Sequence, residues 1–365
     1  KGSHNQTIGG IGVQSQLRSN VEGTLATNKR CFANETINRI FYNRIPKTGS
    51  TSFLKWVETN AASGNFEVYR ATIFTGRQMD SKAQRAFAKA PLIESTDDTK
   101  VDAKSRGTKM SPAEKEEKFA DARRIQTHWD SGSAKVFFER HMMFLDFPKV
   151  NSTQQQPAMV NQLRDPVDRC ISRYNYEVDA KSVPPISLED CMQKEAYCQF
   201  GNWTYTGFLS VDVRPKRRDL IMEECGSNYQ VRWLCGMDED CHPATEASLE
   251  KAIRHLEEYY RFVGILELGS LNLKLLAALL PSFFNADKNI MPVEKRMTDT
   301  HKGVNTKYIS PASRAKLMEI NTLDYRLYIY ALKRLISQAQ ECSLVDPTTL
   351  RPALERLRKY TGNKG

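Results

Sequence analysis

The sequence lacks the marks of several protein classes. Its 365 residues contain no run near 18 consecutive apolar residues, and the longest apolar region, 271–284, is interrupted by Asn272 and Lys274. A membrane-spanning helix is therefore not predicted. The first residues show no signal-peptide pattern, and we find no internal repeat. The GxxxxGK[ST] spacing of a Walker loop is also missing.

What is present indicates an ordinary globular protein with a basic excess. Apolar residues make up 40% of the chain and charged residues 26%, and this length suits one sizeable α/β domain or two small ones. The net charge of +10 favours polyanionic partners, namely nucleic acid, acidic polysaccharide or an anionic membrane. Because zinc-finger spacing, recognition-helix signatures and basic aromatic repeats are missing, nucleic acid is not predicted as a partner.

The most informative segment is 40–53, which reads IFYNRIPKTGSTSF. An apolar strand leads into a hydroxyl-rich turn with one lysine, and a helix follows. The N–H groups and dipole of a helix N-terminus favour a bound phosphate. The residues predicted to form this cradle are Lys47, Thr48, Gly49, Ser50, Thr51 and Ser52. The alternative is a helix that is simply capped by its own Ser and Thr residues.

A second strand and helix meet in segment 158–176, AMVNQLRDPVDRCISRYNY. Pro166 fits the first turn of a helix. Arg164 is expected at the exit of the strand, and Ser172 about two turns into the helix, so both side chains can reach one phosphate.

Together these units resemble the sulfotransferases that use 3′-phosphoadenosine 5′-phosphosulfate. The resemblance implies that the first turn holds the 5′-phosphosulfate, while Arg164 and Ser172 hold the 3′-phosphate. Segment 137–147, FFERHMMFLDF, is similar to the segment with the catalytic histidine in the uronosyl 2-O-sulfotransferases. These Golgi enzymes sulfate the 2-hydroxyl of hexuronic acids in heparan, dermatan or chondroitin chains. The resemblance extends over 42–53, 138–147, 163–176, two cysteine pairs and 262–284.

The resemblance implies an α/β fold in which a mostly parallel sheet is flanked by helices, as in the P-loop kinases. We predict a stem in 1–36, a sulfotransferase domain in 37–345 and a C-terminal tail in 346–365. Segment 92–124 is predicted to be an exposed, charged insertion without a catalytic role, with a helix that starts at Ser111 and ends near Arg124. The resemblance also implies a luminal part of a type II Golgi membrane protein, anchored by a preceding segment, and a homotrimer.

Two residues are assigned to the chemistry. Sulfuryl transfer, like phosphoryl transfer, is an in-line displacement in which charge builds on the leaving oxygen. Lys47 is predicted to neutralise the oxygen between sulfur and the 5′-phosphate. His141 is predicted to be the general base that removes the proton of the sugar hydroxyl; the alternative is a half-buried structural histidine. No metal is expected.

Three further residues are weaker candidates. Lys302 and Thr306, in the basic loop 301–307, are candidates to close over the nucleotide, although a solvated charge run explains that loop equally well. Arg44, beside the first turn, is a candidate to meet the substrate carboxylate, with a surface arginine as the alternative.

Cysteines and sequons indicate a secretory compartment. The spacings of Cys191 with Cys198 and of Cys235 with Cys241 suit short disulfide-closed loops. Zinc binding by Cys235, Cys241 and His242 is the competing interpretation. The predicted glycosylation acceptors are Asn34, Asn151 and Asn202. The sequence does not assign partners to Cys31, Cys170, Cys225 and Cys342, and Cys170 is predicted to be a buried thiol.

Departures from the family pattern concern the substrate. Heparan-acting relatives tend to have an arginine cluster where segment 177–190 offers only Lys181, and Glu139 stands where they can offer a second histidine. Gly49 replaces an alanine of some relatives, a change that the backbone is expected to accept. The predicted activity is 2-O-sulfation of a glycosaminoglycan hexuronic acid. The alternatives are another carbohydrate O-sulfotransferase and a non-catalytic, secreted polyanion-binding protein.

Overall fold

The computed structural model describes residues 31, 36–71, 77–96, 111–153, 155–179, 187–194, 225–226, 228–284, 309–344 and 347–361. The strands are β1 Arg39–Tyr42, β2 Phe66–Arg70, β3 Lys135–Glu139, β4 Ala158–Leu163 and β5 Tyr260–Ile265. The α-helices are α2 Ser50–Gly64, α3 Ser81–Lys89, α4 Pro112–Ser131, α5 Phe147–Val150, α6 Pro166–Asp179, α7 Leu188–Lys194, α9 Tyr229–Cys235, α10 Glu246–Glu258, α11 Gly269–Leu279, α12 Pro311–Ile320, α13 Thr322–Glu341 and α14 Pro347–Thr361. Short 3-10 helices are η1 Ile93–Ser95, η4 Glu239–Cys241 and η5 Leu266–Leu268.

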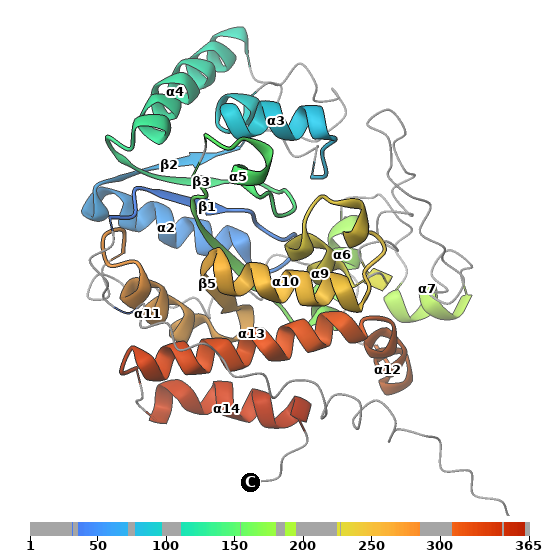
Figure 1. The fold of residues 1–365 in the computed structure, drawn as a ribbon. Helices are drawn as coiled ribbons and strands as arrows, with labels where there is room; N and C mark the ends of the chain where they lie inside the picture. Colours follow the sequence, from blue (N-terminus) through green and yellow to red (C-terminus); the bar gives the residue numbers. More distant parts are fainter. Residues whose placement is uncertain are drawn as a thin grey trace, which may run out of the picture.

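The five strands form one parallel sheet in the order β2-β3-β1-β4-β5. Helices cover both of its faces, with α2 on one side and α3, α4 and α5 on the other (Figure 1). The predicted α/β architecture is therefore confirmed. After β1 the chain continues to β2 and β3, which lie on one side of β1 in the sheet. It then crosses to β4 and β5, which lie on the other side, so a topological switch point lies between β1 and β4. In open parallel sheets such a point is where ligands bind.

Aromatic residues fix the helices on the two faces of β3. Successive side chains of a strand point to opposite faces. Phe137 accordingly lies 6.4 Å, between ring centroids, from Phe53 of α2. Phe138 points the other way, with its ring 6.2 Å from Phe87 of α3 and 5.9 Å from Trp129 of α4. Aromatic rings of the helices thus pack against β3 on both faces of the sheet.

A buried polar network holds the chain where β1 ends. Asn161 of β4 donates to both the carbonyl and the side-chain oxygen of Asn43, each at 2.9 Å. Trp233 of α9 donates to the same carbonyl at 2.8 Å, and the Tyr260 hydroxyl donates to the Asn43 side chain at 2.9 Å. Because Asn43 is completely buried, these bonds replace the hydrogen bonds that its polar groups would otherwise form with water. The position of Asn43 is therefore fixed, and with it the start of the turn that leads to Lys47.

The segment predicted as an exposed insertion belongs to the domain at both of its ends. The helix begins at Ser111 as predicted, with a full capping box, but it continues to Ser131 because Ile125 and Trp129 are buried against the sheet. At the other end, Leu92 and Ser95 are also buried. The prediction of exposure is wrong for 92–96, where Leu92, Ser95 and Thr96 are buried, but it is confirmed for 111–124, where all residues except Phe119 and Ala122 are exposed. Residues 97–110 lie outside the described ranges.

The predicted tail contains a packed helix. Leu350 and Ala353 of α14 are buried, and α14 lies along α13 (Figure 1). Tyr360, near its end, donates a hydrogen bond to Asp165 at the start of α6. Most of the segment 346–365 thus contributes to the fold and reaches one of the predicted phosphate-binding turns.

Three disulfides are described: Cys31–Cys342, Cys170–Cys225 and Cys235–Cys241. The last confirms the prediction, whereas the prediction of a buried thiol at Cys170 is wrong. Cys170 is buried, as predicted, but it is bonded to Cys225, which is 55 positions away in sequence. Cys191 is also disulfide-bonded; its predicted partner, Cys198, lies outside the described residues.

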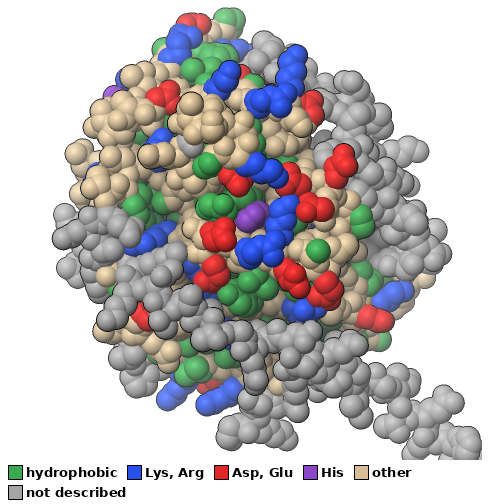
Figure 2. Space-filling view, viewed as in Figure 1, with side chains coloured by type: hydrophobic (Ala, Val, Ile, Leu, Met, Phe, Trp, Pro, Cys, Tyr) green, Lys and Arg blue, Asp and Glu red, His purple; other side chains and the backbone are tan. Residues whose placement is uncertain are grey.

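The described surface mixes charges. On the face shown in Figure 2, basic and acidic side chains lie close to one another. Asn151 follows α5 and is partly exposed, and the Thr153 hydroxyl of its sequon donates to its side-chain oxygen at 2.9 Å. Asn34 and Asn202 lie outside the described residues. Within the described ranges, no helix combines the length and apolar character needed to cross a bilayer.

Candidate active site

The turn between β1 and α2 has the backbone of an anion cradle. Lys47 and Gly49 adopt left-handed conformations, with φ of 68° and 83°. Gly49 precedes the first turn of α2, formed by Ser50, Thr51 and Ser52, and no side chain of the described residues caps it. No acidic residue stands in that turn either. The alternative of a helix capped by its own hydroxyls is thus not what the structure shows, and the N-terminal N–H groups suit an external anion.

Other helices of the chain do begin with a capping side chain. Those residues are Asp80 for α3, Ser111 for α4, Asp146 for α5, Thr245 for α10 and Ser310 for α12. Helices α9, α11 and α13 also begin without a capping side chain of their own. At α9 and α13, however, N–H groups of the first turn are bonded by Asp324 and Asn228 from other parts of the fold.

Two residues of the turn act within the protein. The buried Thr48 hydroxyl donates to the Ile45 carbonyl at 2.9 Å, so its proton stabilises the turn itself. Gly49 lies against η5, where an added Cβ would stand 2.3 Å from Cδ1 of Leu266. The backbone therefore accepts glycine at this position, as expected, whereas the positive φ and the contact with Leu266 both disfavour an alanine.

The turn between β4 and α6 meets the first turn. The guanidinium of Arg164 donates to the carbonyl of Lys47 at 3.2 Å. The backbone of Arg164 is held from the opposite direction by the side-chain amide of Gln230, which bonds its N–H at 3.1 Å and its carbonyl at 2.9 Å. Ser172 lies two turns into α6, partly buried. The two predicted phosphate sites therefore form one region at the carboxyl edge of the sheet.

Unlike α2, helix α6 has its N-terminus filled by the protein. Asp165 is 1% exposed and accepts from the N–H of Asp168 at 3.0 Å. It also accepts from the hydroxyls of Tyr325, at 3.1 Å, and Tyr360. Its own N–H donates to Glu267 at 3.0 Å. What this second turn can offer a ligand is therefore side chains rather than helix N–H groups.

His141 lies two residues after β3, the neighbour of β1 in the sheet. Its Nδ1 is 3.0 Å from the carbonyl of Arg44, which favours the tautomer with the proton on Nδ1 and the lone pair on Nε2. Burial, together with the charges of Arg44, Arg77 and Arg173, holds the pKa of His141 well below its usual value. The imidazole is thus neutral at neutral pH, the state that a general base needs.

Arg44 is not a surface arginine. It is 7% exposed, and its Nε lies 3.0 Å from a carboxylate oxygen of Glu139, at the end of β3. Arg70 approaches the same carboxylate at 3.4 Å. The carboxylate that Arg44 meets is therefore an internal one, and its carbonyl orients His141. Its predicted contact with a substrate carboxylate stays a prediction.

The Lys47 amine lies beside an exposed aromatic ring. Its Nζ is 4.5 Å from the ring centroid of Tyr176, which is 48% exposed, and the Arg173 guanidinium lies 5.7 Å from the same ring. Sequence reasoning gave no role to Arg173 or to Arg77. Arg173 directly follows Ser172 in the second motif, which was the available signal, whereas no pattern surrounds Arg77.

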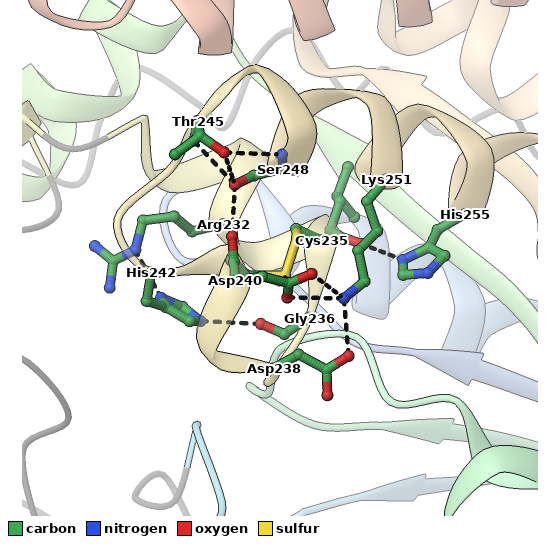
Figure 3. The surroundings of a disulfide bond; sticks show 12 residues. Arg232, Cys235, Gly236, Asp238, Asp240, His242, Thr245, Ser248, Lys251 and His255 are labelled. Carbon is green, nitrogen blue, oxygen red and sulfur yellow. Dashed lines mark hydrogen bonds and ion pairs between the residues drawn. A yellow bond between two sulfur atoms is a disulfide. The ribbon is translucent and has the colours of Figure 1, made fainter.

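The cysteine cluster is not a zinc site. Ligand atoms of Cys235, Asp240 and Cys241 lie within 4.8 Å of one another, but the two sulfurs are bonded together (Figure 3). His242 accepts at Nδ1 from Arg232 and bonds the Gly236 carbonyl through Nε2, both at 3.0 Å. Burial lowers the pKa of His242 to about 4. The zinc interpretation is therefore wrong. Lys302, Thr306 and Lys181 lie outside the described residues.

Several known proteins are similar to this chain in sequence. Human Uronyl 2-sulfotransferase is 26% identical over 209 residues, which cover 53% of this chain and 46% of that protein. Heparin sulfate O-sulfotransferase of Drosophila melanogaster is 25% identical over 67% of this chain and 57% of its own length. Heparan sulfate 2-O-sulfotransferase 1 of Xenopus laevis is 24% identical over 81% of this chain and 70% of its own length. The match thus spans about half the length of the first of these relatives.

The family comparison covers more of the chain. A model of the sulfotransferase family matches residues 31–331, which include both strand-turn-helix units, the His141 segment and β5. The chain belongs to the sulfotransferase family.

Proposed function

We propose that this protein transfers a sulfuryl group from 3′-phosphoadenosine 5′-phosphosulfate to the 2-hydroxyl of a hexuronic acid in a glycosaminoglycan. The observation that supports it most is the bond between the Arg164 guanidinium and the Lys47 carbonyl. It brings two predicted phosphate sites to one edge of the sheet, and His141 is fastened to Arg44 at the same edge. The names of the relatives supply the acceptor class.

Each residue of the site has a part in this reaction. The uncapped N-terminus of α2 suits the 5′-phosphosulfate, and Arg164 with Ser172 suits the 3′-phosphate. A bond forms between the acceptor oxygen and sulfur while the bond between sulfur and the bridging oxygen breaks. Nε2 of His141 takes the hydroxyl proton, and the Lys47 ammonium neutralises charge on the leaving phosphate.

The acceptor side is basic. Arg77 and Arg173 act on His141 electrostatically, and a polyanionic sugar chain would find them beside the base. Disulfides are typical of oxidising compartments. We therefore also propose a place in the Golgi lumen, as the luminal part of an anchored type II protein that forms a homotrimer.

The direct test is incubation with radiolabelled donor and a panel of desulfated heparan, dermatan and chondroitin chains. Disaccharide analysis then locates the label. Label on the 2-position of uronic acid is expected, and the labelled polymer names the substrate. Label at another position would replace the proposal by another carbohydrate sulfotransferase. Tight polyanion binding without label would favour a non-catalytic binding protein.

His141→Ala tests the base, with His255→Ala as its control. Nδ1 of His255 bonds the Leu234 carbonyl at 2.9 Å, and burial lowers the pKa of His255 as well, so the two histidines have similar surroundings. We expect kcat to fall roughly 100- to 10,000-fold for His141→Ala. His255→Ala should lose stability but keep kcat. Full turnover in the His141 variant would refute the base assignment.

A further inference from the structure

Gln230 is a completely buried residue of α9 whose side-chain amide, among the described residues, forms its hydrogen bonds with Arg164. Its Oε1 accepts from the N–H of Arg164 at 3.1 Å, and its Nε2 donates to the carbonyl of Arg164 at 2.9 Å. One amide thus holds both backbone polar groups of the arginine at the exit of β4, as a neighbouring strand would.

The start of α9 is itself fixed by α13. Asp324, 1% exposed, accepts from the backbone N–H of Gln230 at 3.1 Å and of Val231 at 2.8 Å. In return, the N–H of Asp324 donates to the side chain of Asn228 at 3.0 Å. Since these bonds are buried and reciprocal, Gln230 cannot move without moving the start of α13.

The bonds continue from Gln230 to the reacting region. Arg164, fixed at its backbone, extends its guanidinium to the carbonyl of Lys47, whose left-handed φ of 68° sets the shape of the first turn. A small displacement of a positioning group can cost much of the rate or affinity. We infer that Gln230 is a positioning residue of the donor site, aligning Arg164 and, through it, the Lys47 turn. This inference rests on the proposed function.

An amide is the group that this position requires. A glutamate carboxylate can accept from the Arg164 N–H, but its second oxygen would face the Arg164 carbonyl. A protonated carboxyl can both accept and donate. Leucine offers neither and leaves two backbone groups unsatisfied. The chain contains a matched control in Gln126, 4% exposed, whose amide accepts from the N–H of Leu92 at 3.0 Å and donates to Asp130 at 2.9 Å, away from the site.

The experiment measures the Kd of adenosine 3′,5′-bisphosphate for the full chain and for Gln230→Leu, Gln230→Glu and Gln126→Leu, with thermal unfolding of each. Both leucine variants should lose stability, while only Gln230→Leu should bind the bisphosphate about tenfold or more weakly. Gln230→Glu should bind weakly at pH 8 and recover relative to the unchanged protein as the pH falls, because its protonated carboxyl donates to Arg164.

The possible outcomes separate the inference from the proposed function. If the unchanged protein does not bind the bisphosphate, the proposed donor site is wrong and the inference falls with it. If it binds, and Gln230→Leu binds within twofold of Gln126→Leu, the positioning role is refuted. If Gln230→Leu does not fold, the Gln230→Glu variant decides. The positioning role is refuted if this variant binds the bisphosphate as tightly as the unchanged protein at every pH. It is also refuted if its affinity is lower and does not recover in acid.

Discussion

The units β1–α2 and β4–α6 look alike in sequence but use their helix N-termini differently. Both run from a buried strand through a short turn into a helix. The start of α2 is left without a capping side chain, whereas the start of α6 is occupied by Asp165, which two tyrosines hold in place. One strand-turn-helix pattern can therefore present either its backbone or its side chains to a ligand.

The difference suggests a division of tasks. Backbone N–H groups and one lysine suit the group that reacts, since preorganised dipoles stabilise developing charge. Side chains such as Arg164 and Ser172 suit a phosphate that is only held. The following variants test that division.

The largest effect is expected at Lys47. Lys47→Ala should reduce kcat on the order of 100- to 1000-fold with a smaller change in donor affinity, because the lysine acts on charge that develops in the reaction. Arg164→Ala should mainly weaken the affinity for adenosine 3′,5′-bisphosphate, by about 10- to 100-fold, since it removes a charged hydrogen-bond donor. Steady-state kinetics and calorimetry measure both. Equal effects on kcat in the two variants would contradict the division.

A second variant breaks the first turn alone. Gly49→Ala introduces a Cβ 2.3 Å from Leu266 at a φ of 83°, so donor affinity should fall about tenfold through displacement of the turn. Gly132→Ala is the control: its φ is also positive, at 65°, but the nearest atom to an added Cβ is 3.5 Å away, on Asn38. Both should lose stability, of about 1 kcal/mol for the strained φ. A normal donor affinity for Gly49→Ala would show that the turn is not the cradle.

A smaller effect is expected from the support of the second turn. Tyr360→Phe removes one donor to Asp165 and should cost about 1 kcal/mol of stability, with a few-fold loss of donor affinity. Tyr330→Phe removes a similar tyrosine–carboxylate bond, to Glu257 at 2.9 Å, away from the site. Chemical denaturation and bisphosphate titration of both variants make the comparison. If the two variants lose the same affinity, the effect at Tyr360 is not specific to the turn.

The smallest change concerns pH. Because the pKa of His141 lies well below its usual value, kcat/KM should stay constant as the pH falls through 6.5 and decline only in more acidic solution. The same shift means that the contribution of His141 to stability is present above pH 6.5 and is lost as the pH falls toward the folded-state pKa. Arg173→Gln removes one cation and should move the acid limb of the profile upward. An acid limb that does not move would exclude Arg173 from tuning the base.

Sequence reasoning located residues that lie shortly after buried strands. Lys47, His141 and Arg164 come after β1, β3 and β4, which are neighbours in the sheet. Lys47 and Arg164 were identified from a strand, a turn and a helix in succession, whereas His141 was identified from the resemblance of its segment to a known family. The disulfide between Cys235 and Cys241 was equally local, because the two residues are six positions apart.

The residues that hold the site were not predictable in this way. Gln230 is 66 positions from Arg164, and Asp324 is 94 positions from Gln230. Each stands in an ordinary helical pattern, and its meaning comes only from the packing of α9 against α13. The disulfide from Cys170 to Cys225 joins segments 55 positions apart for the same reason. Local patterns locate the reactive groups, and the tertiary structure supplies their supports.

The Cys31–Cys342 disulfide has a mechanical consequence. Cys342 directly follows α13, and Arg334 of that helix donates to the carbonyl of Tyr260, the first residue of β5. The disulfide therefore lies toward the amino edge of the sheet, opposite the edge where β1 and β4 lead into the site. A pull on the chain at Cys31 passes through the covalent bond into α13, instead of along β1. The turn that holds Lys47 is thereby kept out of the path of the load.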